Sequence, residues 1–192
     1  MTDTALVRED DLAIRPLRNN ADDLSLLTRW RAEPHVHEWW DPDDPAPSFE
    51  EVAASYGGRT HPSSPTTACI IELQGRPIGY LQFYRWASYA EDAWEMGVDA
   101  DDATFGLDLF IGEPDLVGYG HGSRVVAMVS RYLERERGAT RISLTTEVTN
   151  QRAQRAYEKA GFRKVREVLD IDTRDGERAR CWLMTRERSV VP

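Results

Sequence analysis

A glycine-rich turn that leads straight into a helix constrains the fold of this chain more than any other feature. Residues 117–123 read Val-Gly-Tyr-Gly-His-Gly-Ser, and the apolar strand-like run 105–111 comes before them. Because glycine has no Cβ, the backbone at Gly118, Gly120 and Gly122 can turn its N–H groups inward around an anion. The first amides of the following helix, at the positive end of its dipole, favour the same anion. The turn therefore predicts a pyrophosphate-binding site at a strand-to-helix junction.

Two other glycine-rich phosphate sites fit this turn poorly. No Gly-Lys-Ser/Thr follows the glycines, so the segment is not a nucleotide-triphosphate loop. A dinucleotide fold would need an acidic residue about 20 positions later, within a strand–helix–strand unit that opens a parallel sheet. Glu147 falls loosely near that distance, but the chain before the turn is no such opening.

Hydrophobic periodicity on both sides of the turn predicts an α/β (α+β) fold with a mixed central sheet of about six to seven strands flanked by helices. Strands are expected over 12–18, 67–73, 78–86, 105–111, 141–146, 163–172 and 178–186. Helices are expected after the cap Asn19-Asn20, from the capping box Ser48–Glu51 to Tyr56, at 123–137 and at 150–160. Pro34 is expected to open a short second segment, residues 34–40. Residues 88–104 are expected to be an irregular acidic loop, residues 1–10 a flexible tail, and residues 11–188 one domain.

The charge of the chain limits its partners. Its 33 acidic residues outnumber 24 basic residues, which gives a formal charge of −9 among 192 residues. Such a surface repels nucleic acid and anionic lipid and attracts cations, although solubility alone would also explain it. Cys69 and Cys181 lie in apolar runs without metal-ligand spacing, and no apolar run reaches the length of a membrane span. We therefore expect a cytoplasmic protein, monomeric or homodimeric, without nucleic-acid or membrane partners.

A second motif makes the reading of the turn specific. After the next strand, residues 150–162 read Asn-Gln-Arg-Ala-Gln-Arg-Ala-Tyr-Glu-Lys-Ala-Gly-Phe. The pair of motifs resembles the GNAT acetyltransferase superfamily, and the resemblance extends over residues 12–186. It implies a GNAT fold and acetyl-CoA as cofactor. By the same resemblance the cofactor contacts are Leu109, Phe110, Ile111, Val117, Gly118, Tyr119, Gly120, His121, Gly122, Ser123, Asn150 and Ala153.

The resemblance also gives individual roles within these motifs. Residues 117–123 would hold the pyrophosphate through their N–H groups, and Asn150 would contact the pantetheine arm. Tyr157 would lie near the thioester sulfur, where a phenol with a pKa of about 10 can protonate a leaving thiolate. Val117 and His121 depart from the usual residues of the family, but neither departure removes a backbone donor.

Asp108 is the candidate base and ammonium anchor. It stands in the middle of the apolar run Phe-Gly-Leu-Asp-Leu-Phe-Ile, and period-2 geometry puts it on one face with Gly106 and Phe110. A carboxylate at such a position is costly unless it has a partner or a purpose. It could bind a cationic amine, accept its proton, or do both; a structural pairing with an arginine is the alternative.

The strand around Asp108 resembles that of the aminoglycoside 6′-N-acetyltransferases within the GNAT superfamily. Further resemblances are a Trp-Trp pair, a Pro-Ile-Gly-Tyr strand and an acidic, tryptophan-bearing loop. They imply that an aminoglycoside, a polycationic amine, is bound by Trp39, Trp40, Tyr80, Glu91, Asp92, Trp94, Glu95, Asp108 and Glu147. Glu147 is included because Thr145 stands where this branch usually has an acidic residue, and a strand reaching Glu147 would present it on the same face. For Trp39, Trp40 and the acidic loop, plain core or solvated surface remains the alternative.

Three functions remain open from these patterns. The first is a 6′-N-acetyltransferase for aminoglycosides. The second is an acetyltransferase for another amine, such as a siderophore precursor or a polyamine, because the Trp30 to Val36 segment resembles the opening of siderophore acylases. The third is a non-catalytic acetyl-CoA-binding module, which would leave Asp108 and Tyr157 idle. His35 and His37 lack a third ligand at a suitable spacing, so no metal site is expected.

Overall fold

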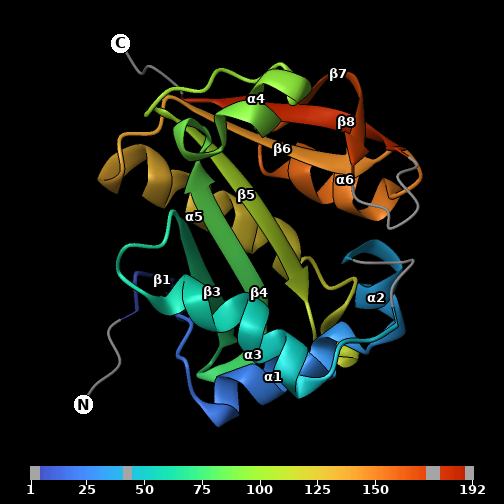
Figure 1. Cartoon of the computed structure of the whole chain (residues 1–192). Coiled ribbons are helices and arrows are strands. Elements are labelled where there is room, and N and C mark those ends of the chain that lie inside the picture. The colour runs from blue at the N-terminus through green and yellow to red at the C-terminus, as the bar shows by residue number, and fades with distance from the viewer. Residues whose placement is uncertain (1–4, 41–44, 172–177, 189–192) are drawn as a thin grey trace. The chain divides into compact units, whose positions relative to one another are not determined.

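The computed structural model describes residues 5–40, 45–171 and 178–188, in two compact units. The first unit comprises Met1–Gln82 and Asp108–Gly122, and the second comprises Phe83–Leu107 and Ser123–Pro192. Strands of both units belong to an eight-stranded sheet of order β1-β2-β3-β4-β5-β6-β8-β7 (Figure 1). The expected mixed sheet with flanking helices is confirmed, with slightly more strands than expected.

The additional strand comes from the N-terminal segment. Residues 7–9, expected to lie in a flexible tail, form β1 (Val7–Glu9), which pairs antiparallel with β2 (Leu12–Pro16). Asp10, which lies between the two strands, has φ 51°. Aspartate tolerates this left-handed conformation better than most residues, which permits a tight reversal that the composition did not reveal.

The remaining elements follow the expected order with one insertion. The first unit holds α1 (Ala21–Arg31), α2 (Pro34–Trp40), α3 (Phe49–Gly57), the 3₁₀ segment η1 (Gly58–Thr60), β3 (Thr66–Leu73) and η3 (Pro114–Leu116). The second unit holds η2 (Trp86–Tyr89), α4 (Ala90–Met96), β6 (Arg141–Glu147), α6 (Gln151–Lys159), β7 (Arg163–Ile171) and β8 (Arg178–Glu187). The elements β4 (Arg76–Arg85), β5 (Thr104–Ile111) and α5 (His121–Glu136) contribute residues to both units. Helix α4 lies in the segment expected to be irregular, so that expectation was wrong.

Helix starts in the first unit are set by local side-chain caps. Asn20 accepts a hydrogen bond from the backbone of Asp23 at the start of α1. Ser48 and Glu51 form the expected reciprocal capping box at the start of α3. These caps satisfy amides that have no partner within the helix, so both boundaries could be read from the sequence.

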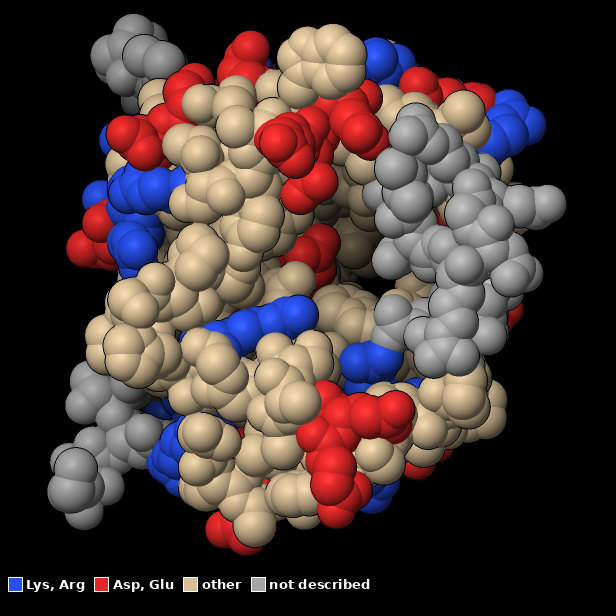
Figure 2. Space-filling model, in the orientation of Figure 1, with Lys and Arg blue, Asp and Glu red and all other residues tan. Residues whose placement is uncertain are grey.

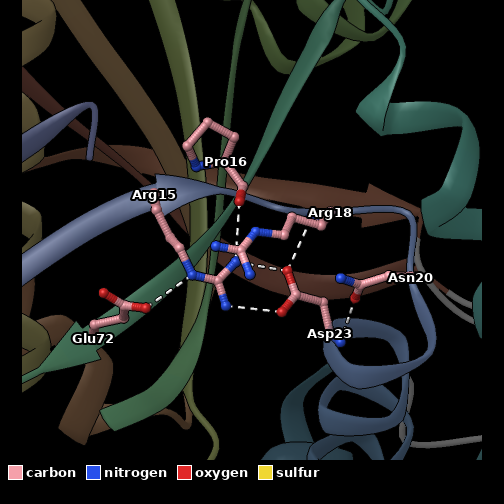
Figure 3. A network of polar contacts seen from close by, with 6 residues as sticks. All are labelled: Arg15, Pro16, Arg18, Asn20, Asp23 and Glu72. Atoms are coloured by element: carbon pink, nitrogen blue, oxygen red, sulfur yellow. Dashed lines mark hydrogen bonds and ion pairs between the residues drawn. The ribbon is translucent and has the colours of Figure 1, made fainter. Parts of the chain in front are cut away.

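A buried network joins the start of α1 to the strands of the first unit (Figure 3). The Arg15 guanidinium of β2 donates to both Asp23 oxygens, at 2.6 and 2.8 Å, and to Glu72 of β3 at 2.8 Å. Asp23 also accepts from the Arg18 backbone N–H. Burial works against the charge of Arg15, but the two carboxylates outweigh it and raise its pKa. The network pairs the charges that helix packing buries in this unit.

A second closed network surrounds Glu113, just after β5. Its carboxylate accepts from Arg29 at 2.5 Å, from the Trp30 indole at 2.9 Å and from Arg76 at 2.7 Å. Burial disfavours the carboxylate charge, but these three donors overcome that cost and lower the pKa of Glu113 to about 2. Gly112 packs so closely that a Cβ there would lie 2.1 Å from the Trp30 ring. The network therefore fixes the end of β5 against α1.

In the second unit, three strand pairings build the sheet. Parallel pairing of β5 with β6 includes Thr104↔Arg141 and Gly106↔Ser143. β6 and β8 are antiparallel over seven registered residues, from Arg141↔Glu187 to Glu147↔Cys181. β7 pairs antiparallel with β8 and carries a register shift between Lys164 and Arg166. Among the described residues, no helix is long and apolar enough to cross a membrane.

Candidate active site

Asp108 is held in the first unit by an amide. It is half-buried on β5, and its Oδ2 accepts a hydrogen bond from Nε2 of Gln82 on β4 at 2.8 Å. An N–H donor stabilises the ionised form of a carboxylate. The mid-strand carboxylate therefore has a polar partner that holds one of its oxygens in place.

Behind Gln82 lies a cation. Oε1 of Gln82 accepts from the Tyr80 hydroxyl at 2.8 Å and from Arg59 Nη1. The Arg59 guanidinium lies 4.6 Å from the centre of the Tyr56 ring, within cation–π range. Gln82 thus contacts both the guanidinium of Arg59 and the carboxylate of Asp108.

A cluster of aromatic rings packs beside these polar side chains. Tyr80 meets Phe110 at 5.6 Å and Tyr56 at 5.2 Å between ring centres, and Trp40 meets Phe110 at 4.9 Å. Tyr80 is 0% exposed, and burial raises the pKa of its phenol, so the hydroxyl remains a donor. Trp40 packs partly buried on this core and donates to the Tyr56 hydroxyl. Tyr80 is therefore no surface for a ligand in this structure, and Trp40 has the alternative role of core packing.

Helix α2, which carries Trp39 and Trp40, is tied to β5 by a histidine. The His35 Nε2 lies 2.9 Å from the backbone oxygen of Ile111, so Nε2 carries the proton and donates. Trp39 is half-buried on the same helix. His35, which was not expected to bind a metal, therefore has a structural hydrogen bond in this unit.

The glycine-rich turn has the backbone that the sequence predicted. Gly118 and Gly120 have φ of 90° and 85°, which residues with a Cβ rarely adopt. A Cβ at Gly118 or Gly122 would meet no described atom within 4 Å, so no side chain blocks an approach to the backbone there. Helix α5 begins at His121, inside the turn rather than after it. An extended anion such as pyrophosphate fits a cradle of this kind.

The cofactor residues expected from β5 differ in their burial. Phe110 is 9% exposed and lies in the aromatic cluster, whereas Leu109 and Ile111 are half-buried. Val117 and Ser123 are also half-buried, and Tyr119 is 75% exposed. Their contacts with a cofactor remain predictions.

In the second unit, Asn150 and Tyr157 belong to one well-defined helix. Asn150 caps α6 by accepting from the Ala153 backbone at 3.0 Å. Gln154 fixes the preceding loop by donating to the carbonyls of Glu147 and Val148 at 2.9 and 3.0 Å. Tyr157 is 9% exposed, with its ring 6.0 Å from that of Phe162. The motif thus has a structural role, and contacts of Asn150 and Tyr157 with a cofactor remain predictions.

Strand β6 extends to Glu147. Glu147 was expected to take the role of the acidic residue missing at Thr145 if the strand continued that far. Both residues lie in the strand, two positions apart, and so share a face. The Glu147 carboxylate accepts from the Thr149 hydroxyl at 3.1 Å. It is half-buried, so a cationic ligand could reach it.

Helix α4 presents the acidic residues on an ordered support. Ala93 and Met96 pack with Trp86, Val168 and Cys181 in a buried cluster. Arg166 of β7 donates to the Met96 carbonyl at the end of the helix. On the other side of α4, Trp94 is 83% exposed, and three exposed acidic residues accompany it: Glu91, Asp92 and Glu95. Figure 2 shows acidic side chains gathered on this part of the surface.

Sequence reasoning missed Gln82, Arg59, His35 as a structural donor and Arg166. Gln82 could have been found, because it lies two residues after Tyr80 on a strand and so shares its face. Arg59 could not, because it reaches the site from a 3₁₀ turn far away along the chain. Among the described residues, no group of three or more His, Cys, Asp or Glu side chains could hold a metal ion.

Comparison with known proteins gives the same picture. Residues 19–169 match the acetyltransferase (GNAT) domain family. Over 150 residues the chain is 30% identical to aminoglycoside N(6′)-acetyltransferase type 1 of Klebsiella pneumoniae, covering 78% of this chain and 74% of that protein. It is 31% identical over 108 residues to N-hydroxyputrescine acetyltransferase of Acinetobacter baumannii, covering 56% of this chain and 48% of that protein.

A solved structure supports the relationship at the level of the fold. The aminoglycoside acetyltransferase AAC(6′)-Ib, in complex with coenzyme A and kanamycin, superimposes with a TM-score of 0.75. The two sequences are 28% identical, and the match covers 92% of this chain and 95% of that one. The fold therefore indicates the same family as the glycine-rich turn and the motif of residues 150–162.

Proposed function

Because the chain belongs to the acetyltransferase (GNAT) family, we propose that it transfers the acetyl group of acetyl-CoA to the 6′-amine of an aminoglycoside. The observation that carries this proposal is Asp108, a half-buried β5 carboxylate that accepts a hydrogen bond from Gln82, in a chain 30% identical to an aminoglycoside N(6′)-acetyltransferase over 150 residues. A carboxylate at this position suits an ammonium group that must be bound and then deprotonated.

In this reaction acetyl-CoA supplies the acetyl group and a thiolate leaving group. Asp108 would bind the ammonium group of the acceptor and take its proton, so that the free amine could attack the thioester carbonyl. The nitrogen would lose its second proton to solvent as the C–S bond breaks, and Tyr157 would donate its phenolic proton to the departing sulfur and regain one from solvent. The glycine-rich turn and the start of α5 hold the pyrophosphate through backbone N–H groups. A carboxylate, a phenol and backbone N–H groups thus have the chemistry that these three roles require.

The acidic residues of α4 favour a substrate with several positive charges. Glu91, Asp92 and Glu95 are exposed beside Trp94, and carboxylates pair with ammonium groups while indole faces accept sugar C–H groups and cations. Glu147 of β6 adds a further carboxylate. An amine-studded sugar matches this combination better than a singly charged amine does.

The second candidate is acetylation of a siderophore precursor. It is favoured by the 31% identity to an N-hydroxyputrescine acetyltransferase. The match covers 56% of this chain, less than the match to the aminoglycoside enzyme. Siderophore acylases would be expected to carry a catalytic histidine on the central strand, where this chain has Asp108.

Release of free thiol from acetyl-CoA tests the two candidates together. The acceptors are kanamycin, gentamicin, apramycin, spermidine and hydroxylysine. Turnover with kanamycin that disappears with a kanamycin derivative lacking the 6′-amine supports the first function. Turnover confined to spermidine or hydroxylysine refutes the first function. If none of the five acceptors releases thiol, aminoglycoside acetylation is refuted as well.

A further inference from the structure

The side chain of Gln82 has two ends of opposite hydrogen-bonding character, and each end meets a matching partner. Its NH₂ donates to Asp108 Oδ2 at 2.8 Å. Its carbonyl oxygen accepts from the Tyr80 hydroxyl at 2.8 Å and from Arg59. If the amide were rotated by half a turn, its oxygen would face the carboxylate and its NH₂ would face the guanidinium. That arrangement would lose the hydrogen bonds to Asp108 and Arg59, so these two charged partners favour one direction of the amide.

The two donors behind Gln82 are themselves fixed. Tyr80 is 0% exposed and packs against the rings of Tyr56 and Phe110. Arg59 lies over the Tyr56 ring, and its Nη1 also lies 3.4 Å from the Tyr80 hydroxyl. Tyr80 cannot leave without opening the aromatic cluster, and Arg59 is held by its contacts with the Tyr56 ring and the Tyr80 hydroxyl. The direction of the Gln82 amide is therefore decided by packed residues rather than by solvent.

This arrangement acts on Asp108. An N–H donor is held more strongly by an ionised carboxylate oxygen than by an oxygen of the neutral acid. The contact therefore favours the ionised form of Asp108 and restrains the rotation of its carboxylate. The other end of the same amide contacts the guanidinium of Arg59, so Gln82 bridges the two charged side chains.

We propose that Gln82 is a positioning residue for Asp108, and that Arg59 and Tyr80 set the direction of its amide. The proposal rests on the proposed function in one respect, that Asp108 anchors the acceptor amine. The titratable groups that face Gln82 from the elements packed around it are Asp108 of β5, Tyr80 of β4 and Arg59 of η1, and Tyr56 of α3 lies beneath Arg59. Of these, Asp108 is the group whose ionisation falls in the acidic range.

The test follows the titration of Asp108 directly. Protein labelled with ¹³C at aspartate carboxyl carbons is titrated by NMR, with Asp108→Asn identifying the signal. Gln82→Leu removes both hydrogen-bonding ends at similar volume, so we expect the titration midpoint of Asp108 to rise by about one pH unit. Tyr80→Phe removes one donor to the amide and keeps the ring, so we expect a smaller rise in the same direction.

Steady-state rates with kanamycin and acetyl-CoA give the second readout. For Gln82→Leu we expect kcat/KM to fall by about tenfold to a hundredfold, with the acid limb of its pH profile moved up by the same amount as the NMR midpoint. Glu72→Gln is the matched control, because it removes a contact of Arg15 in a separate buried network. We expect this control to lower Tm and to leave the Asp108 midpoint and the pH profile unchanged.

The outcomes separate the positioning role from the reaction. An Asp108 midpoint unchanged in both Gln82→Leu and Tyr80→Phe overturns the role of Gln82, whatever the rates. A shifted midpoint in a protein that acetylates no aminoglycoside supports the role of Gln82 and refutes the proposed function instead. If Gln82→Leu does not fold, Tyr80→Phe alone decides, since its ring packing is kept.

Discussion

The first unit contains two kinds of arginine–carboxylate arrangement, one with direct contact and one with an amide that contacts both groups. In the network of Arg15, the guanidinium meets Asp23 and Glu72 directly, at 2.6 to 2.8 Å. At the candidate active site, the amide of Gln82 stands between Arg59 and Asp108. Direct contact compensates the charge of the carboxylates and serves folding, whereas the amide of Gln82 holds the carboxylate of Asp108 through a neutral donor. Glu113, with three donors, belongs to the first kind.

The largest expected effect concerns Arg15, the centre of the network of direct ion pairs. Replacing Arg15 with Met leaves Asp23, which is 2% exposed, as a buried charge without its guanidinium. We expect the free energy of unfolding to fall by about 3–5 kcal/mol, the usual cost of removing one partner of a buried ion pair. Urea unfolding measures it. We expect kcat of the folded fraction to be unchanged. A variant as stable as the wild type would show that this network does not hold α1 to the strands.

The converse change is Asp108→Asn, which removes a charge from the site rather than from the folding network. We expect kcat/KM to fall by about a hundredfold, in keeping with the loss of an acid–base group, while Tm changes little. Coenzyme A affinity, measured by isothermal titration calorimetry, should be retained. Full turnover by the variant would remove Asp108 from the chemistry. The companion variant Tyr157→Phe should slow acetyl transfer more than it weakens cofactor binding.

The pH dependence of the free energy of unfolding tests whether Glu113 belongs to a network that stabilises the fold. Its pKa is lowered from 4.5 to about 2 in the folded protein, so the unfolded chain binds the proton more readily. The stability it contributes is therefore present above pH 4.5 and is lost as the pH falls from there towards 2. Between these values the wild type should lose more stability than Glu113→Gln in urea unfolding. Parallel curves for the two proteins would contradict the network.

The smallest expected effect concerns α4, where the carboxylates are exposed. Replacing Glu91, Asp92 and Glu95 together with their amides should raise KM for kanamycin by about three- to tenfold with kcat nearly unchanged, because exposed pairs contribute little each. The dependence of kcat/KM on ionic strength should weaken in parallel. The exposed Glu50→Gln in α3 serves as the control. If KM and its salt dependence stay as in the wild type, α4 does not recruit the amine.

Much of this fold could be predicted from local patterns in the sequence. The caps at Asn20 and Ser48, the positive-φ glycines 118 and 120, and the mid-strand position of Asp108 all depend on chemistry within a few residues. The two motifs that indicated the GNAT family are local in the same sense. Such features are legible because a cap, a turn or a strand periodicity depends mainly on its own neighbourhood.

Other features depend on residues that only folding brings together. The α4 segment was expected to be irregular because it is acidic, yet Arg166 at its end and the buried Ala93 and Met96 stabilise a helix there. Residues 7–9 joined the sheet because β2 offered them a partner. Tyr80 was expected to face a ligand, but it is enclosed by rings from α3 and β5.

The sequence by itself determined the class of fold, the glycine turn and the carboxylate at position 108, because each is encoded in residues that are neighbours in the chain. Only the tertiary structure decided what that carboxylate touches. Arg59, Gln82 and Asp108 lie on a 3₁₀ turn and on two different strands, and their hydrogen bonds exist only after the sheet has assembled. Hydrogen bonds reach about 3 Å, so contacts between distant segments depend on packing that no local pattern records.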